Sequence, residues 1–224
     1  LTLYFMGEVE RVYAETHLWQ KNRTIAPSSG VVREFYRHRV KEDIEESVDI
    51  EATAEDTGLA LLRFISGAIG QITYSDAGPG EPSNAGIIYG SEGSLKLSGS
   101  RSGRPIQLIP SGTHSPVGYE DLLDEVPDFH LDDVTSRIFG GKSRISEYDL
   151  SFAQADRKLI AIELQDFANA IVHGKEPEVP PEVGRDAVAL SYSILESGHL
   201  AKPVFFDDVR HNRINKYQQS INEP

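Results

Sequence analysis

Histidines and carboxylates are the residues of this chain that could bind metal ions or transfer protons. The seven histidines stand at positions 17, 38, 114, 130, 173, 199 and 211, and no two of them have the HxH or HxxxH spacing of zinc ligands. The acidic stretch 120–133 contains many aspartates but has neither the alternation nor the central glycine of an EF-hand loop. We interpret that stretch as a solvated acidic surface, and the sequence predicts no metal site.

Nucleophiles and phosphate-binding loops are equally hard to find. The chain has no cysteine, which excludes disulfides, thiolate metal sites and a cysteine nucleophile, and it has no G-x-S-x-G sequence around a serine. The glycines at 78, 80, 90, 93, 99 and 103 match neither G-x-G-x-x-G nor the P-loop. We therefore expect them to be turn residues, and we expect no dinucleotide site within this chain.

Strands are predicted wherever β-branched and aromatic residues cluster or alternate with polar ones. The predicted strands cover residues 9–16, 49–53, 59–65, 68–74, 87–89, 94–97 and 203–209. Two pairs of them flank short turn sequences, Ser66-Gly67 and 90–93, so we expect two hairpins. Residues 75–85, rich in glycine and proline, separate the hairpins and are expected to be irregular.

Two helices are predicted near the end of the chain, over residues 157–173 and 182–198. The first carries an apolar stripe at helical spacing, which consists of Ile160, Leu164, Phe167, Ala168 and Ile171. Asp156 is its expected N-cap and Gly174 its stop. Residues 1–7 look like the end of another helix without an N-cap, so we expect the chain to begin inside an element and Leu1 not to be the natural start.

The order of these elements, strands first and helices later, predicts an α+β fold with a mostly antiparallel sheet and helices packed on one face. Residues 1–209 are predicted to form a single domain in which 98–155 is a long insertion. Residues 210–224 are predicted to be a polar tail, loose or bound to a partner. The other sheet face is left free, and a free face with apolar residues favours a homo-oligomer.

Composition narrows the class of protein. Hydrophobic residues make up 39% and charged residues 25%, as in ordinary globular proteins, and no apolar run reaches the length of a membrane span. The net charge of −13 repels phosphate backbones, so we expect no nucleic-acid partner. No signal peptide is recognisable, and the absence of cysteine fits a cytoplasmic location, which we expect.

Five segments, in a fixed order, connect this sequence to a known family. They are GEVERVYAET (7–16), EDTGLALLRFISGAIGQITYS (55–75), IIYGSEGSLKL (87–97), ELQDFANAIVHGKEPEV (163–179) and GRDAVALSYSILESGHLAKPV (184–204). In order and approximate spacing they resemble the C-terminal domain of the glucose–fructose oxidoreductase / inositol dehydrogenase (Gfo/Idh/MocA) family. None of the five is specific alone, but their succession is.

The resemblance implies a division of labour between two domains. In the family an N-terminal Rossmann domain binds NAD or NADP and carries a Glu-Lys-Pro motif, and an Asp–His pair lies in a D-x-x-x-H motif just before the GEV segment. All of these fall upstream of Leu1, so the resemblance places the catalytic residues outside this chain and predicts that the chain alone binds no cofactor. The partners it implies are that Rossmann domain, a small-molecule substrate and further copies of the chain, in a dimer or tetramer formed through the sheet face.

Family analogy also indicates which residues of this chain face the substrate. The candidates follow the first strand, end the first hairpin, or precede the second one: His17, Trp19, Tyr74, Ser75, Asp76, Ser83 and Asn84. Their polar groups would hydrogen-bond substrate hydroxyls or a carboxylate, and Trp19 would stack on a sugar ring. The structural alternative is that aromatic residues anchor the sheet and that Ser-Asp-Gly-Pro sequences make turns. In the 98–155 insertion, His130 and Tyr148 are of interest, although packing within a loop explains them better.

The predicted function is the substrate-recognition and assembly part of an NAD(P)-dependent oxidoreductase that acts on a sugar, polyol or related hydroxyl compound. The isolated chain is expected to be inactive. Two alternatives remain open: an NAD-using glycoside hydrolase built on the same scaffold, and a stand-alone domain that binds a ligand or a partner without catalysis.

Overall fold

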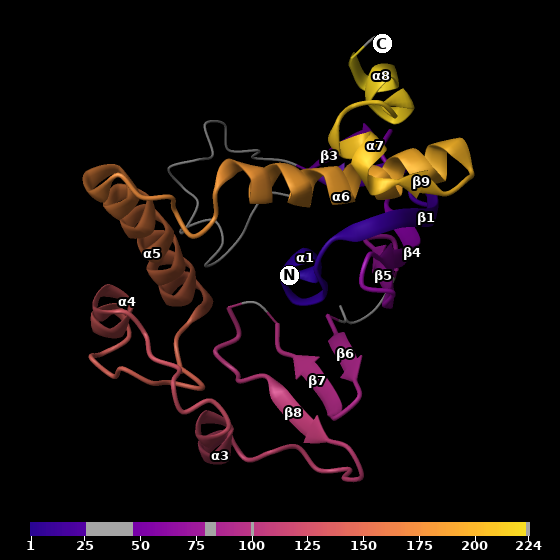
Figure 1. Cartoon of the computed structure of the whole chain (residues 1–224). Helices are drawn as coiled ribbons and strands as arrows, with labels where there is room; N and C mark the ends of the chain where they lie inside the picture. The colour runs from indigo at the N-terminus through magenta and orange to yellow at the C-terminus, as the bar shows by residue number, and fades with distance from the viewer. Residues whose placement is uncertain (26–46, 79–83, 100, 223–224) are drawn as a thin grey trace. The chain divides into compact units, whose positions relative to one another are not determined.

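The structure is a computed structural model of the chain that describes residues 1–25, 47–78, 84–99 and 101–222 (Figure 1). The chain forms two compact units. The first unit combines Leu1–Gly80 with Glu178–Pro224, and the second consists of Glu81–Pro177. In the described part of the chain, none of the helices is both long and apolar enough to cross a lipid bilayer.

A four-stranded antiparallel sheet is the centre of the first unit, with strand order β5-β4-β1-β9. Its strands are β1 (Val9–His17), β4 (Thr57–Phe64), β5 (Ile69–Ser75) and β9 (Val204–Phe205). A short helix, α1 (Thr2–Met6), precedes β1. The strands β2 (Asn22–Ile25) and β3 (Val48–Glu51) form a separate antiparallel pair. The predicted first hairpin, β4 with β5, is confirmed.

The predicted strand 203–209 is wrong beyond its first residues. Only Val204–Phe205 pair with β1, and the chain then turns into the helix α7 (Phe206–Arg210). Asp207 and Asp208 fall in the first turn of α7, where carboxylates are favoured by the partial positive charge of a helix N-terminus. Arg210 falls in its last turn, where a cation is favoured, so the charge order of this segment favours a helix.

The core of the first unit lies between the sheet and the helix α6 (Pro181–Leu200), which runs along β1 (Figure 1). Burial alternates along β4 and, from Val12 to Glu15, along β1, which has a register shift between Val9 and Arg11, so that alternate residues point towards the helices. The buried cluster consists of Val9, Val12, Ala14, Ala60, Leu62, Phe64, Ala189, Leu190, Ile194, Val204 and Phe206. On α6, the buried Ser197 hydroxyl accepts the N–H of Ala14 at 2.9 Å and donates to the carbonyl of Lys202 at 2.7 Å. The strand β9 pairs with Arg11 and Val12 of β1 and does not reach Ala14. The Ser197 hydroxyl therefore satisfies the backbone N–H of Ala14.

The opposite side of the same sheet, which we call the open face, carries the alternate residues of β1, β4 and β5. In register they form the rows Arg11–Arg63–Ile69, Tyr13–Leu61–Gln71, Glu15–Leu59–Thr73 and His17–Thr57–Ser75. Leu59, Leu61 and Ile69 are all more than half exposed. The fold is therefore α+β with helices on one face of an antiparallel sheet, as predicted.

Part of the segment that was predicted to be a polar tail, loose or bound to a partner, forms a helix that contacts α6. Residues Lys216–Asn222 form the helix α8. The buried Glu196 carboxylate on α6 accepts the N–H groups of Tyr217 at 3.0 Å and Gln218 at 3.3 Å. The Tyr217 hydroxyl donates to Glu55 at 2.6 Å. These partners lie far away in the sequence, so the local composition of the tail cannot reveal them.

The second unit begins with an antiparallel sheet of β6 (Gly86–Gly90), β7 (Gly93–Leu97) and β8 (Gln107–Pro110), the first two being the predicted second hairpin. The helices α3 (Tyr119–Asp124), α4 (Asp133–Ile138) and α5 (Phe152–His173) follow. The helices α3 and α4 and the start of α5 make the 98–155 stretch partly helical.

Helix α5 differs from the prediction at its start and on its surface. Its N-cap is Ser151, in a capping box with Gln154, and not Asp156. Asp156 lies within the helix, almost fully buried, and accepts Arg101 Nε at 2.6 Å. Three residues of the predicted inward stripe, Leu164, Phe167 and Ile171, are exposed. Within this unit α5 contacts the six-residue α4, which is too short to cover the whole stripe.

Candidate functional site

A buried carboxylate organises the loop that follows β1. The side chain of Asp56, at the start of β4, is 1% exposed. It accepts the N–H of Trp19 at 3.1 Å to each oxygen and that of Gln20 at 2.9 Å, and it pairs with Arg23 at 3.2 Å. Its backbone N–H donates to the carbonyl of His17 at 3.0 Å. One residue thus holds both ends of the loop.

The charge of Asp56 is stabilised in this position. Burial alone would raise the pKa of the carboxyl group, but the N–H groups of Gln20 and Trp19, the Arg23 guanidinium and the Thr57 hydroxyl lower the pKa to about 2. The carboxylate is therefore ionised at neutral pH and fully engaged with its neighbours. Its role is to position the loop, since these four groups already occupy its oxygens.

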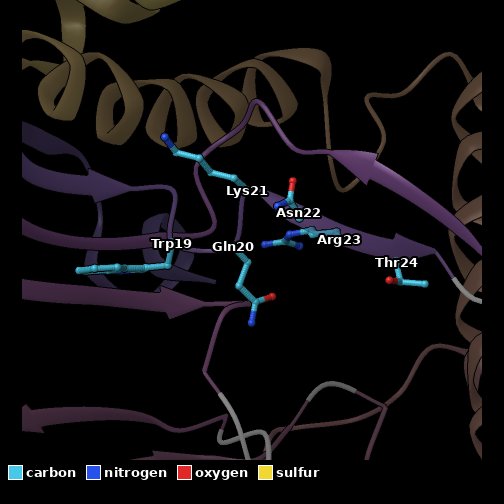
Figure 2. A pocket seen from close by; sticks show the side chains of 6 residues that line it. All are labelled: Trp19, Gln20, Lys21, Asn22, Arg23 and Thr24. Atoms are coloured by element: carbon cyan, nitrogen blue, oxygen red, sulfur yellow. The ribbon is translucent and has the colours of Figure 1, made fainter.

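The loop presents an aromatic platform, which we define as the side chains of His17 and Trp19. Their rings lie 4.1 Å apart between centroids with 50° between their planes. The Trp19 side chain projects away from Thr24 (Figure 2) and is two-thirds exposed, at 67%. An indole that is held at the backbone and largely exposed is suited to stack on the apolar face of a ring-shaped ligand.

Hydroxyl groups lie beside this platform on the open face. His17, Thr57 and Ser75 are directly opposite one another on β1, β4 and β5. The Thr57 and Ser75 hydroxyls are 2.9 Å apart, and Thr57 also donates to Asp56 at 3.1 Å. An aromatic surface next to a row of hydroxyl groups is an arrangement that can bind a polyhydroxylated molecule.

The next turn of the chain is tied to the same loop. The N–H of Asp76 donates to the carbonyl of Asp56 at 2.8 Å, and the Gln20 side chain donates to the carbonyl of Ala77 at 3.2 Å. Asp76 therefore lies near the platform, and its side chain is exposed. The structure brings together His17, Trp19, Ser75 and Asp76 of the predicted site residues.

Tyr74 lies on the other side of the sheet. It stands opposite Gly58, on the helix-covered face, and its ring covers that glycine so closely that a Cβ there would meet ring atoms at 2.5 to 2.8 Å. Burial raises the pKa of Tyr74, and the negative charges of Glu55, Asp76 and Asp56 raise it further. This environment makes Tyr74 a packing residue beneath the platform and not a member of its surface.

Asn84 and Ser83 were predicted from the loop before β6. Asn84 is exposed and belongs to the second unit, and Ser83 lies outside the described residues. Conversely, the sequence prediction missed Asp56, Thr57 and Gln20. The sequence does show an aspartate, Asp56, directly before an apolar strand. Its partners in the loop lie more than thirty positions away, and Trp19 is 37 residues from it.

The segment from Trp19 to Thr24 lines a hollow of about 720 Å³ that is wide open to solvent (Figure 2). Lys21 and Gln20 project in opposite directions from the loop that forms it (Figure 2). In the described ranges, no group of three or more histidines, aspartates or glutamates is placed to hold a metal ion. The site has the character of a recognition surface, with hydrogen-bonding groups and one stacking surface.

Comparison with known proteins agrees with this domain type. Residues 1–96 match the model of the family described as the GFO/IDH/MocA C-terminal domain. This part of the first unit and the start of the second are therefore similar to that domain. No curated protein sequence matches the chain.

Solved structures with this fold include dehydrogenases. Levoglucosan dehydrogenase in complex with NADH is 18% identical, with a TM-score of 0.59, over 92% of this chain and 46% of that one. An NAD binding oxidoreductase from Klebsiella pneumoniae is 15% identical, with a TM-score of 0.58, over 92% and 47%. The WlbA dehydrogenase from Bordetella pertussis, in complex with NADH and UDP-GlcNAcA, is 20% identical, with a TM-score of 0.51, over 92% and 44%. This chain therefore spans a little under half the length of these solved chains.

The described residues do not fit a dinucleotide site. All of the strand pairs among them are antiparallel. Dinucleotide-binding folds use parallel strands and place the pyrophosphate at a glycine-rich turn between a strand and a helix.

Proposed function

We propose that this chain is the substrate-recognition and assembly part of an NAD(P)-dependent oxidoreductase that acts on a sugar, polyol or related hydroxyl compound. The proposal assigns cofactor binding to a separate N-terminal Rossmann domain and substrate contact to His17, Trp19, Ser75 and Asp76. The observation that carries it is the exposed aromatic platform beside the hydroxyl row of Thr57 and Ser75. The family match over residues 1–96 and the NADH complexes of proteins with this fold support the same assignment.

The physical reason for a hydroxylated substrate is the combination of groups. Sugars present hydroxyls at their rims and apolar C–H groups on their faces, so they need hydrogen-bonding partners and a flat apolar surface at the same time. Trp19 supplies the flat surface, while Ser75, Thr57 and the Asp76 carboxylate supply donors and acceptors.

Substitution of Trp19 in the longer protein that carries this domain tests the proposal. A panel of sugars and polyols is first screened for oxidation coupled to reduction of NAD or NADP. For the best substrate, Trp19→Ala is expected to raise KM about two- to tenfold, since an aromatic contact contributes about 0.5–1.5 kcal/mol. Trp19→Phe should retain most of the affinity, and Tyr89→Ala, which removes another exposed aromatic ring, should leave KM unchanged. An unaltered KM in Trp19→Ala contradicts the proposal.

The location of the cofactor site is tested with the chain by itself. Titration of the 224-residue chain with NADH is expected to give no saturable binding by calorimetry or fluorescence. Trp19 is the only tryptophan, so energy transfer to NADH would be seen directly if the cofactor bound near the platform. Saturable micromolar binding would overturn the division of labour between the two domains.

A further inference from the structure

The helix α8 connects the end of the chain to the segment that holds the aromatic platform. The hydroxyl of Tyr217, in the first turn of α8, donates to Glu55 Oε2 at 2.6 Å across 162 positions of the sequence. Glu55 directly precedes Asp56, the carboxylate that accepts the N–H groups of Trp19 and Gln20. The last helix of the chain and the loop that carries Trp19 are therefore bonded to neighbouring residues.

The short segment between β3 and β4 runs alongside this loop. The N–H of Ala52 donates to the carbonyl of Lys21 at 2.7 Å, and the N–H of Asp56 donates to the carbonyl of His17 at 3.0 Å. A short segment that is bonded to a loop at both of its ends moves together with that loop. A group that fixes Glu55, which lies between those two ends, therefore limits the movement of the loop as well.

Tyr217 is itself held by two residues of α6. Its N–H donates to the buried carboxylate of Glu196 at 3.0 Å. Its ring meets the ring of His199 edge-on, with 6.1 Å between the ring centroids. Because α6 packs against β1, the Tyr217 hydroxyl is presented to Glu55 from an element of the core.

The hydrogen bond between Tyr217 and Glu55 is of a strong kind. Burial raises the pKa of Tyr217, and the hydrogen bond to Glu55 and the negative charge of that residue raise it further, so the hydroxyl keeps its proton at neutral pH. A hydroxyl that donates to a carboxylate forms a charge-assisted bond, which is shorter and stronger than a bond between neutral groups. Removal of the hydroxyl alone therefore breaks this link with little change in packing.

We propose that Tyr217 is a positioning residue of the substrate site, which fixes Glu55 and, through residues 52–56, the loop that carries Trp19. This role rests on the proposed function, because it raises the affinity for a substrate only if Trp19 contacts that substrate. Tyr217 acts through the segment before β4 and makes the last helix of the chain part of the recognition machinery.

The fluorescence anisotropy of Trp19 in the 224-residue chain is the first test, and it needs no substrate. Trp19 is the only tryptophan, so the signal comes from this loop alone. Tyr217→Phe removes the hydroxyl and Glu55→Ala removes its acceptor, and each is expected to lower the anisotropy because the indole gains local motion. The double variant should show no further decrease, since both substitutions break the same hydrogen bond. Tyr4→Phe, which removes an exposed hydroxyl from α1, should leave the anisotropy unchanged.

Two results of this measurement overturn the proposal. The first is an anisotropy in Tyr217→Phe and Glu55→Ala that equals that of the unsubstituted chain. The second is a decrease in the double variant equal to the sum of the two single decreases, which would show that the two residues act separately.

Kinetics of the longer protein that carries this domain separate positioning from a general loss of stability. Tyr217→Phe is expected to raise KM by no more than Trp19→Ala does, about two- to tenfold, with kcat unchanged, because the platform binds substrate and transition state alike. In a Trp19→Ala background, Tyr217→Phe should not raise KM further, and a further rise overturns the proposal. An unaltered KM in Trp19→Ala itself contradicts the proposed function, whereas an unaltered anisotropy contradicts only the role of Tyr217, so the two failures are distinguishable.

Discussion

At the scale of single residues, Asp56 decides the geometry of the candidate site. It has no surface exposed to a ligand, yet the positions of Trp19, Gln20 and Arg23 depend on it. The exposed residues of the platform are therefore recognisable from their chemistry, whereas the residue that positions them is recognisable only from its contacts.

The lowered pKa of Asp56 makes a prediction about acid stability. Its pKa of about 2 in the folded chain lies below the ordinary value of 3.8, so the unfolded chain takes up the proton first as the pH falls. The stability contributed by this carboxylate is present above about pH 4 and is lost as the pH approaches 2. Asp56→Asn is expected to lower Tm at pH 7. At pH 2–3 the difference in Tm between this variant and the unsubstituted chain is expected to be smaller.

Thermal unfolding followed by the fluorescence of Trp19 measures this directly, since the only tryptophan is in the loop that Asp56 holds. Asp128→Asn, which alters an exposed aspartate of the second unit, is the control and should leave the curve at pH 7 unchanged. If the difference in Tm between Asp56→Asn and the unsubstituted chain stays constant from pH 7 to pH 2, the link between the ionisation of Asp56 and stability is contradicted.

At the residue scale, the sequence points to exposed groups and does not reveal the contacts that hold them in place. His17, Trp19, Ser75 and Asp76 lie together around one loop, and their contact with a substrate stays a prediction. Tyr74 does not lie on the same face, because β-strand side chains alternate and Tyr74 is adjacent to Ser75. The alternation of side chains can be predicted from the sequence. Only the structure shows which of the two faces the helices cover.

At the scale of elements, close approach of α6 to β1 depends on a glycine. A Cβ at Gly198 would meet Thr16 Oγ1 at 2.4 Å, Cγ2 at 2.9 Å and Cβ at 3.1 Å. Rotation of Thr16 exchanges one clash for the other, so the helix has to move. Gly198→Ala is expected to destabilise the chain by about 1–3 kcal/mol, the range found for overpacked interiors.

Gly184, near the start of the same helix, is the matched control. Nothing lies within 4 Å of a Cβ built there. Gly184→Ala is therefore expected to stabilise the chain by about 0.5–1 kcal/mol, because alanine loses less backbone entropy in a helix. Urea unfolding of both variants measures the two effects, and equal midpoints would show that α6 does not depend on close packing at Gly198.

Elements with a strong local signal are those that the sequence predicts well. The hairpin of β4 and β5 surrounds the Ser66-Gly67 turn, and α5 stops at Gly174 in a left-handed conformation, both as expected. The failures occur where distant contacts decide. Phe206 is buried as the first residue of α7 and not as part of a strand, and α8 is held through Glu196, twenty or more positions away.

At the scale of the whole molecule, the open face is the feature that a single copy leaves unexplained. Leu59 and Leu61 of β4 are 51% and 59% exposed on this face, and Ile69 of β5 is 76% exposed. Apolar side chains grouped on a flat sheet tend to be covered by a partner, and in soluble proteins that partner is most often another copy. We therefore propose a dimer or tetramer formed through this face.

Leu61→Glu tests that assembly. If this face is an interface, the new carboxylate lies either beside the same carboxylate of another copy or among apolar side chains. Both situations disfavour association. The side chain points away from the core, so the fold should be retained, which far-ultraviolet circular dichroism checks. Light scattering is expected to give a smaller mass for Leu61→Glu than for the unsubstituted chain at equal concentration. Val172→Glu, at a more exposed position on α5, should not change the mass. A monomeric unsubstituted chain, or a mass that Leu61→Glu leaves unaltered, would show that the open face has another role.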